Sequence, residues 1–286
     1  MTRIIVRHVL AACALFALSG AQALELEDCR ISAAPGQPGV KARCGTMLRP
    51  TTPDDPTSPP VELRIAVVPA LNLTPETDAV VPIAGGPGQG SVEFYLMVRH
   101  AFERLRRNRD ILLVDQRGTG ESSRMDCPID DDAILYETEF TMDDTIRYMQ
   151  ECLAELPHDP RYFTTSVAVT DLEAVREALG YSALNLYGVS YGSRVAQHFA
   201  RRYPESTRTV TIDGVVPPQV ALGPEIATES QKAVDNILRR CAEDERCSER
   251  FPDIAETFDR VVAELRSGAV EVTIPHPNTG RPETLS

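Results

Sequence analysis

The sequence is short of positive charge. Its 29 lysine and arginine residues are outnumbered by 42 aspartate and glutamate residues, and the formal net charge is −13 at pH 7. Nucleic acids and anionic membrane surfaces attract basic proteins, so this balance argues against both as partners. The acidity says nothing specific about a substrate, because it also serves solubility.

Long apolar runs are missing beyond residue 23, so no membrane-spanning helix is expected there. At the N-terminus, two arginines precede an apolar run at residues 9–18. Residues 19–23 then offer small side chains at the two positions that a signal peptidase reads. This pattern is typical of a secretory signal peptide (residues 1–23) cleaved after Ala23. A membrane anchor would need a longer run, and a lipoprotein signal would need Cys13 after the run, not inside it. We expect a periplasmic or extracellular protein with no membrane attachment after cleavage.

No C-x-x-C pair occurs and the histidines are scattered, which argues against a zinc site, so no metal is expected. Six cysteines remain in the mature chain, and an exported chain meets an oxidising compartment. Their spacing suggests pairing between neighbours, which would make local structural staples: Cys29–Cys44, Cys127–Cys152 and Cys241–Cys247. Other pairings stay open, because spacing alone does not decide connectivity.

Strand and helix patterns alternate along the first 218 residues, which predicts an α/β fold with a mostly parallel, doubly wound sheet. Strands are expected at 61–67, 79–84, 111–114, 184–187 and 207–212. Helices are expected at 143–156, from a Thr170-x-x-Glu173 capping box to Gly180, and at 191–202. Residues 61–67 alternate as in a half-buried strand, and Pro82 is awkward in a central strand because it cannot donate to the ladder.

The pattern changes beyond Pro218. Residues 223–267 indicate two helices with the Cys241/Cys247 loop between them, and residues 268–275 indicate one strand. We expect residues 24–218 to form the N-terminal part of an α/β core and residues 219–286 to begin a lid.

The motif Gly188-Val189-Ser190-Tyr191-Gly192 lies between a predicted buried strand and a predicted amphipathic helix. The motif alone is weak evidence, but this context is what a nucleophile elbow requires. A serine on so sharp a turn has strained backbone geometry, and the two glycines let strand and helix pass closely. The helix N-terminus directs its free amides and dipole toward the serine. Ser190 is therefore the predicted nucleophile.

A second glycine-rich segment, Gly85-Gly86-Pro87-Gly88, follows the predicted strand at 79–84. Acyl transfer needs backbone N–H groups aimed at the developing oxyanion. Gly86 and Tyr191 are the candidate donors, whereas Pro87 has no N–H. A phosphate-binding loop is excluded, because no Lys-Ser or Lys-Thr follows the glycines.

A third segment, residues 115–122, follows the predicted strand at 111–114 and begins Asp115-Gln116-Arg117-Gly118. We interpret its Asp and Arg as structural residues that fix this loop beside the site, with a catalytic role for Asp115 as the alternative. Its Gly-Thr-Gly is not a dinucleotide fingerprint, because no helix is predicted to open there.

These three motifs, in this order, resemble the proline iminopeptidase and tripeptidyl aminopeptidase family of α/β-hydrolases. Residues 171–192 and 241–252 are similar to its secreted tripeptidyl aminopeptidase branch, and the resemblance covers roughly residues 40–280. It implies an α/β-hydrolase fold with Ser190 as nucleophile and the backbone N–H groups of Gly86 and Tyr191 as oxyanion hole. It also implies release of short peptides from free N-termini, with a peptide substrate and without a cofactor.

The histidines depart from the family pattern, in which the base comes last in the order Ser, acid, His. His8 leaves with the signal peptide, and His198 is expected mid-helix behind the nucleophile. His100 and His158 precede the elbow. His276, in the last Pro-rich stretch, is a weak candidate base.

The catalytic acid also departs from the family pattern. Asp213 ends a predicted strand after the elbow and is a weak candidate acid, with a loop-capping role as the alternative. In the family, the catalytic Asp and His follow the lid, and this chain ends within the predicted lid. We therefore expect both to be absent from this chain, together with the last strands of the sheet. The chain would be a fragment or a truncated product, or its missing part a separate polypeptide.

The motifs together predict a secreted serine hydrolase of peptide or amide bonds. Without a base, Ser190 is a weak nucleophile near neutral pH. Two alternatives stay open: an esterase of the same fold that acts on small acyl esters, and an inactive relict.

Overall fold

A computed structural model of the chain describes residues 24–32, 38–127, 141–221, 223–268, 270–275 and 280–285. The predicted signal peptide and His276 lie outside these residues. The chain forms two compact units. The first comprises Met1–Met125 and His158–Val216, and the second comprises Asp126–Pro157 and Pro217–Ser286. The prediction that residues 219–286 begin a lid stays a prediction.

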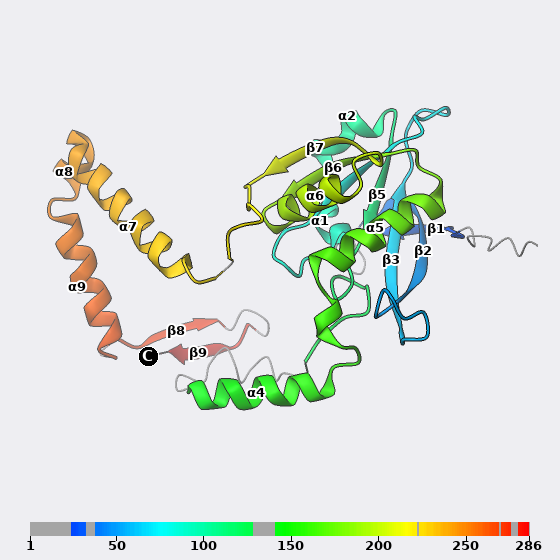
Figure 1. The fold of residues 1–286 in the computed structure, drawn as a ribbon. Helices are drawn as coiled ribbons and strands as arrows, with labels where there is room; N and C mark the ends of the chain where they lie inside the picture. Colours follow the sequence, from blue (N-terminus) through cyan, green and yellow to red (C-terminus); the bar gives the residue numbers. More distant parts are fainter. Residues whose placement is uncertain are drawn as a thin grey trace, which may run out of the picture. The chain divides into compact units, whose positions relative to one another are not determined.

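The first unit is built on a seven-stranded sheet with strand order β1-β2-β3-β5-β4-β6-β7 (Figure 1). Strands β5, β4, β6 and β7 pair in parallel, whereas β1, β2 and β3 are added by antiparallel pairing. Since β2 has the same direction as the parallel strands, the sheet is mostly parallel, as predicted. The strands are β1 (Glu27–Ile31), β2 (Val40–Pro50), β3 (Pro60–Val68), β4 (Ala79–Ile83), β5 (Asp110–Val114), β6 (Leu184–Val189) and β7 (Thr207–Asp213).

Helices cover both faces of this sheet. One core cluster joins alternate residues of β3, such as Leu63, to helices α5 and α6 through residues such as Val175 and Phe199. The other cluster joins the next residues of β3, such as Val68, to α1 through residues such as Tyr95. The helices of this unit are α1 (Ser91–Val98), η1 (Arg99–Phe102), α2 (Glu103–Arg106), η2 (Pro160–Tyr162), α5 (Thr165–Leu179) and α6 (Tyr191–Arg202).

Two details of the strands differ from expectation. Residues 61–67 alternate in burial only at first, and β3 is buried on both faces from Ala66 to Val68, because a core cluster packs on each side of the sheet there. Strand β4 is central even though it contains Pro82. Its ladder to β5 includes only Ala79 and Val80, so Pro82 lies beyond those pairings.

The start of α5 was predicted wrongly. Thr164 caps the helix by accepting a hydrogen bond from Val167 N, so the helix begins five residues before Thr170. Thr170 is inside the helix and donates to Val167 O at 2.7 Å, and Glu173 pairs with Arg176. The Thr-x-x-Glu spacing also fits a threonine bonded back to its own helix, which the sequence alone does not separate from a cap. The helix does end at Gly180 as predicted, with φ of +75°.

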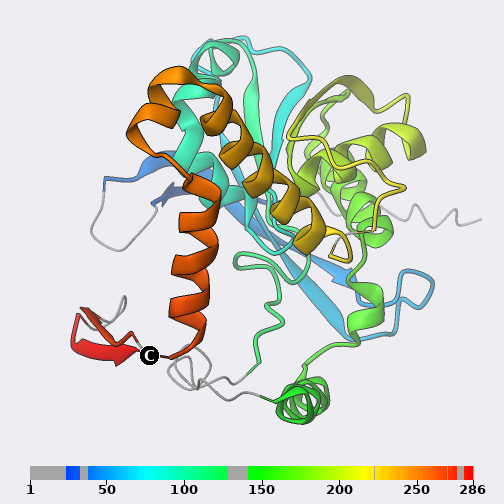
Figure 2. The same ribbon diagram turned by 90° about the vertical axis from the view of Figure 1, so that its left-hand side faces the viewer.

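The second unit contains α4 (Met142–Glu155), α7 (Ile226–Glu243), α8 (Glu245–Arg250), α9 (Ile254–Arg266) and a hairpin of β8 (Val272–Pro275) and β9 (Pro282–Leu285). Helices α7 and α9 both lead away from the short α8 (Figure 2). The prediction of two helices at 223–267 missed α8, and the strand predicted at 268–275 is shorter than expected. Among the described residues, no helix is both long and apolar enough to span a membrane.

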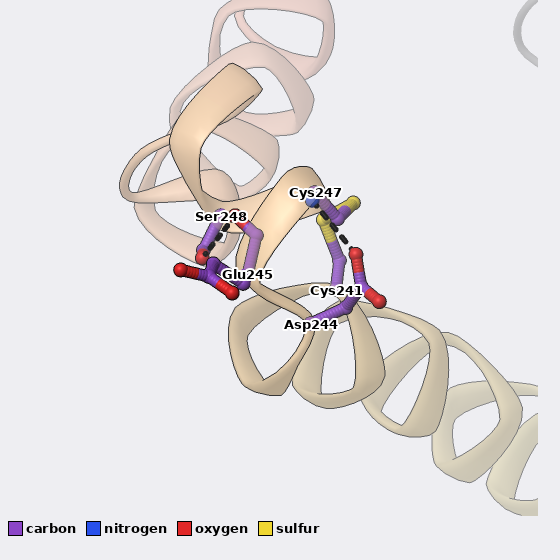
Figure 3. Close-up of a disulfide and its surroundings, with 5 residues drawn as sticks. All are labelled: Cys241, Asp244, Glu245, Cys247 and Ser248. Carbon is purple, nitrogen blue, oxygen red and sulfur yellow. Dashed lines mark hydrogen bonds between the residues drawn. A yellow bond between two sulfur atoms is a disulfide. The ribbon is translucent and has the colours of Figure 1, made fainter.

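The three predicted disulfides are confirmed. Cys29–Cys44 joins β1 to β2, Cys127–Cys152 holds α4, and Cys241–Cys247 joins α7 to α8. Figure 3 shows why a new helix starts inside the last loop: Asp244 accepts a hydrogen bond from Cys247 N at 2.9 Å and so caps α8. The capping aspartate and the disulfide, whose cysteines are six residues apart, fix the turn between α7 and α8 by local contacts alone.

Candidate active site

Ser190 forms the sharp turn between β6 and α6. Its backbone has φ of +54° and ψ of −122°, and its side chain is exposed. A non-glycine residue in this region is strained by about 1–3 kcal/mol and persists only when its surroundings hold it there. One such holder is the end of β7, because Ser190 N donates to Asp213 O at 2.8 Å.

The glycines on either side of Ser190 are required by close backbone contacts. A Cβ on Gly188 would overlap the carbonyl group of Gly192. A Cβ on Gly192 would overlap the carbonyl oxygen of Ile83 and would lie 2.6 Å from that of Ala84. The helix start therefore packs directly on the backbones of β6 and β4, which confirms the predicted close passage of strand and helix.

The glycine loop that follows β4 lies against Ser190. A Cβ on Gly85 would be 3.1 Å from Ser190 Cβ and 3.5 Å from Ser190 Oγ. Gly86 has φ of +104°, and Tyr191 is the first residue of α6. Within the part of the chain that the structure describes, neither the Gly86 N–H nor the Tyr191 N–H has a protein acceptor. Their role as oxyanion donors stays a prediction.

Asp115 holds the far end of this glycine loop. Its buried carboxylate accepts hydrogen bonds from Val92 N at 3.0 Å and from Glu121 N at 3.2 Å. A Cβ on Gly90 would lie 2.9 Å from Asp115 Oδ1, so loop and carboxylate are in close contact. Burial raises the pKa of Asp115, and the hydrogen bonds from the two amides oppose that rise. These contacts agree with the structural interpretation of this residue.

We expect Asp115→Asn to lower the free energy of unfolding by about 1–3 kcal/mol and to slow acylation of Ser190. One of the two buried N–H donors would face an amide NH₂ group and lose its acceptor. Urea unfolding and the rate of labelling by a fluorophosphonate probe measure the two effects. Glu121→Gln is the matched control, because this exposed side chain in the same loop pairs only with Arg64. Equal behaviour of the two variants would contradict the prediction.

Arg117 anchors the same segment to α5 and to the end of β2. Its guanidinium donates two hydrogen bonds to Asp171, at 2.7 and 2.9 Å, and one to Thr51 O at 2.9 Å. Arg49 also donates to Asp171, at 3.2 Å. Arg117 and Asp171 are both buried. Arg117 was predicted from the sequence to be structural, but its partner Asp171, 54 residues away, was not identified.

The candidate acid, Asp213, accepts a hydrogen bond from Tyr187 OH at 2.7 Å. This contact raises the pKa of Tyr187. Asp213 is beside the nucleophile through its backbone, but its carboxylate is engaged by a tyrosine. A role as catalytic acid therefore has no support from these contacts.

The described histidines make their contacts elsewhere. His100 pairs with Glu103 at 2.8 Å, and His158 approaches Thr51 at 3.3 Å. His198 lies inside α6, where burial lowers its pKa. Among the described residues, no hydrogen bond joins Ser190 Oγ to an imidazole, and no cluster of His, Cys, Asp or Glu is arranged to hold a metal ion.

Comparison with known proteins agrees with this geometry. A family model described as "alpha/beta hydrolase fold" matches residues 78–235. "Serine protease Hip1" of Mycobacterium tuberculosis is 28% identical over 252 residues, which are 79% of this chain and 46% of that protein. "Tripeptidyl aminopeptidase" of Streptomyces lividans is 26% identical over 154 residues, which are 49% of this chain and 29% of that protein. The chain thus spans less than half the length of these curated relatives.

Among solved structures, a proline iminopeptidase-related protein from Thermus thermophilus is similar with a TM-score of 0.37 and 23% identity. The match covers 59% of this chain and 44% of that one.

Proposed function

Since this chain belongs to the alpha/beta hydrolase family, we propose that it is a secreted serine hydrolase of peptide or amide bonds, with Ser190 as nucleophile. Two named relatives, a serine protease and a tripeptidyl aminopeptidase, support a peptide substrate. By that likeness, we propose that the substrate is a peptide with a free N-terminus. The three disulfides and the signal-like first 23 residues support export.

The observation that carries the proposal is the exposed Ser190 side chain beside a glycine loop. Ser190 Oγ would attack the scissile carbonyl carbon and form a tetrahedral intermediate. The N–H groups of Gly86 and Tyr191, which have no protein acceptor among the described residues, are free to bind the oxyanion. The amine leaves, and water hydrolyses the acyl-enzyme. The proton from Ser190 must pass to a base, and we propose that the catalytic Asp and His lie outside these 286 residues.

The test compares three substrates of matched size: a peptidyl anilide with a free amino group, the same anilide with an acetylated amino group, and a simple acyl ester. We expect hydrolysis of the free anilide to exceed that of the acetylated one by at least about tenfold in kcat/KM, since one tenfold step is about 1.4 kcal/mol of binding to the transition state. Preference for the ester would support the esterase alternative. No turnover and no fluorophosphonate labelling would support the inactive alternative or a fragment that needs its other half.

A further inference from the structure

The backbone segment that follows β7 wraps around the nucleophile. Besides the hydrogen bond from Ser190 N to Asp213 O, a Cβ on Gly214 would lie 3.8 Å from Ser190 N. Gly214 itself has φ of +57°. Val216, two residues on, is the last residue of the first unit. The segment 213–216 thus lies against the backbone of Ser190 on one side of the elbow.

Ser193, three residues after the nucleophile, ties this segment to the elbow. Its hydroxyl is completely buried. Ser193 Oγ donates to Ser190 O at 2.6 Å and accepts from Val216 N at 2.8 Å. One buried oxygen atom therefore links the carbonyl group of the nucleophile to the segment that wraps it.

Gln197, one helical turn further along α6, supports the same link. Its Nε2 donates to Ser193 O at 3.0 Å and to Val216 O at 3.4 Å. The N–H and the C=O of Val216 are both bound to side chains of the nucleophile helix. Because both backbone polar groups of Val216 are hydrogen-bonded to side chains of α6, they fix the distance between the segment 213–216 and that helix.

A serine that bonds back to the carbonyl three residues earlier is common in helices and by itself indicates only a local turn. Two observations go beyond that. The second partner of Ser193 lies 23 residues away, on a different element. The carbonyl it binds belongs to Ser190, whose φ of +54° and ψ of −122° are costly and need external support.

We propose that Ser193, supported by Gln197, is a positioning residue that holds the strained backbone of Ser190 in its reactive geometry. The Ser190 N–H is held by the end of β7, and the Ser190 C=O accepts from both the hydroxyl and the backbone N–H of Ser193, at 2.6 and 3.0 Å. Val216 connects the two holders through one continuous segment. This inference rests on the proposed function of Ser190 as nucleophile, and it adds the residues that keep the nucleophile in place.

The test uses Ser193→Ala with Ser206→Ala as the matched control. Ser206 is also buried, and its hydroxyl also donates one short hydrogen bond, to Glu173 at 2.7 Å, but it lies before β7 and away from the elbow. We expect both variants to fold with reduced stability. We expect the maximal rate of fluorophosphonate labelling to fall about tenfold in Ser193→Ala only, without a change in the concentration of probe at half-saturation. Equal labelling rates in the two variants would overturn the proposal.

A milder variant guards against misfolding of Ser193→Ala. Gln197→Met removes both hydrogen bonds to Ser193 O and Val216 O while it keeps the side-chain length at a half-buried position. We expect a fall of about threefold in the same maximal rate. If the maximal labelling rate were unchanged both in this variant and in any folded Ser193 variant, the result would count against a positioning role for Ser193 and Gln197.

Amide hydrogen exchange separates this inference from the proposed function. The acceptor of the Ser190 N–H, Asp213 O, is untouched by the Ser193 substitution. We nevertheless expect this N–H to exchange at least about tenfold faster in Ser193→Ala than in Ser206→Ala, because the hydroxyl that links Ser190 O to Val216 N is lost. A wild-type polypeptide that also holds the catalytic Asp and His and is still not labelled would contradict the proposed function, and the exchange result would still decide the positioning role. Equal exchange at Ser190 in both variants would overturn it.

Discussion

Ser190→Ala is expected to abolish labelling by the fluorophosphonate probe and, in a polypeptide that also holds the catalytic Asp and His, to reduce hydrolysis by on the order of 10⁵-fold or more, while the fold is retained. The loss should be this large because the acyl-enzyme forms on the serine oxygen, and its removal leaves only binding and oxyanion stabilisation. Mass spectrometry of the labelled wild-type chain should place the adduct on Ser190. An adduct on another residue, or labelling that persists in Ser190→Ala, would contradict the assignment.

Ser190→Gly tests the strain in the same position. Glycine tolerates positive φ, so this variant should lose activity as alanine does, yet unfold with a free energy higher than that of Ser190→Ala by about 1 kcal/mol. The comparison of the two inactive variants removes any contribution of the hydroxyl. Urea unfolding measures the difference. A glycine variant that is no more stable than the alanine variant would show that the elbow is not strained in solution.

The elbow was predictable because its geometry is enforced locally. Gly188 and Gly192 lie four residues apart, and the backbone contacts they permit are contacts of one strand, one turn and one helix. The close approach of Gly85 to Ser190 needed only the further expectation that loops at the carboxyl ends of neighbouring parallel strands meet. Local sterics and strand order together placed the candidate nucleophile and its loop.

Residues whose partners are distant in sequence were not predictable in this way. The sequence around Thr170 contains a pattern that fits a helix start, and only the structure shows that Thr164 is the cap and that Asp171 faces Arg117. Strands β1 and β2 were also missed. Strand β2 contains an alternation of apolar and polar residues from Val40 to Ala42 that could have indicated it, but its pairing partners depend on the rest of the sheet.

The catalytic acid and base were not predictable from the sequence for the same physical reason. The acid and the base of a triad meet the nucleophile only through tertiary structure, and their side chains carry no spacing relative to the elbow. The described contacts assign Asp213 to Tyr187 and leave Ser190 Oγ without a histidine partner among the described residues. What we propose that this chain supplies to the chemistry is the nucleophile, its glycine loop and the hydrogen bonds that hold them.

Asp171→Leu is expected to lower the free energy of unfolding by about 3–5 kcal/mol, because it leaves the Arg117 guanidinium buried without its carboxylate. The side chains of the pair are 2% and 4% exposed, so water does not replace the lost partner. Two bonds from Arg117 and one from Arg49 end on this carboxylate, so it ties both β2 and the segment 115–122 to α5. Chemical denaturation of the purified variant measures the loss.

Removing both charges should cost less than removing one. In Arg117→Met with Asp171→Leu, no charge of the pair remains buried, and we expect at least about half of the lost stability to return. The carbonyl of Thr51 would still lose its donor, so full recovery is not expected. Arg49→Met is the matched control, because it removes the part-exposed partner of Asp171 and leaves the bidentate pair intact. If the double variant were less stable than Asp171→Leu, the loss would come from packing or from the other hydrogen bonds of Arg117, and the buried unpaired charge would not be its cause.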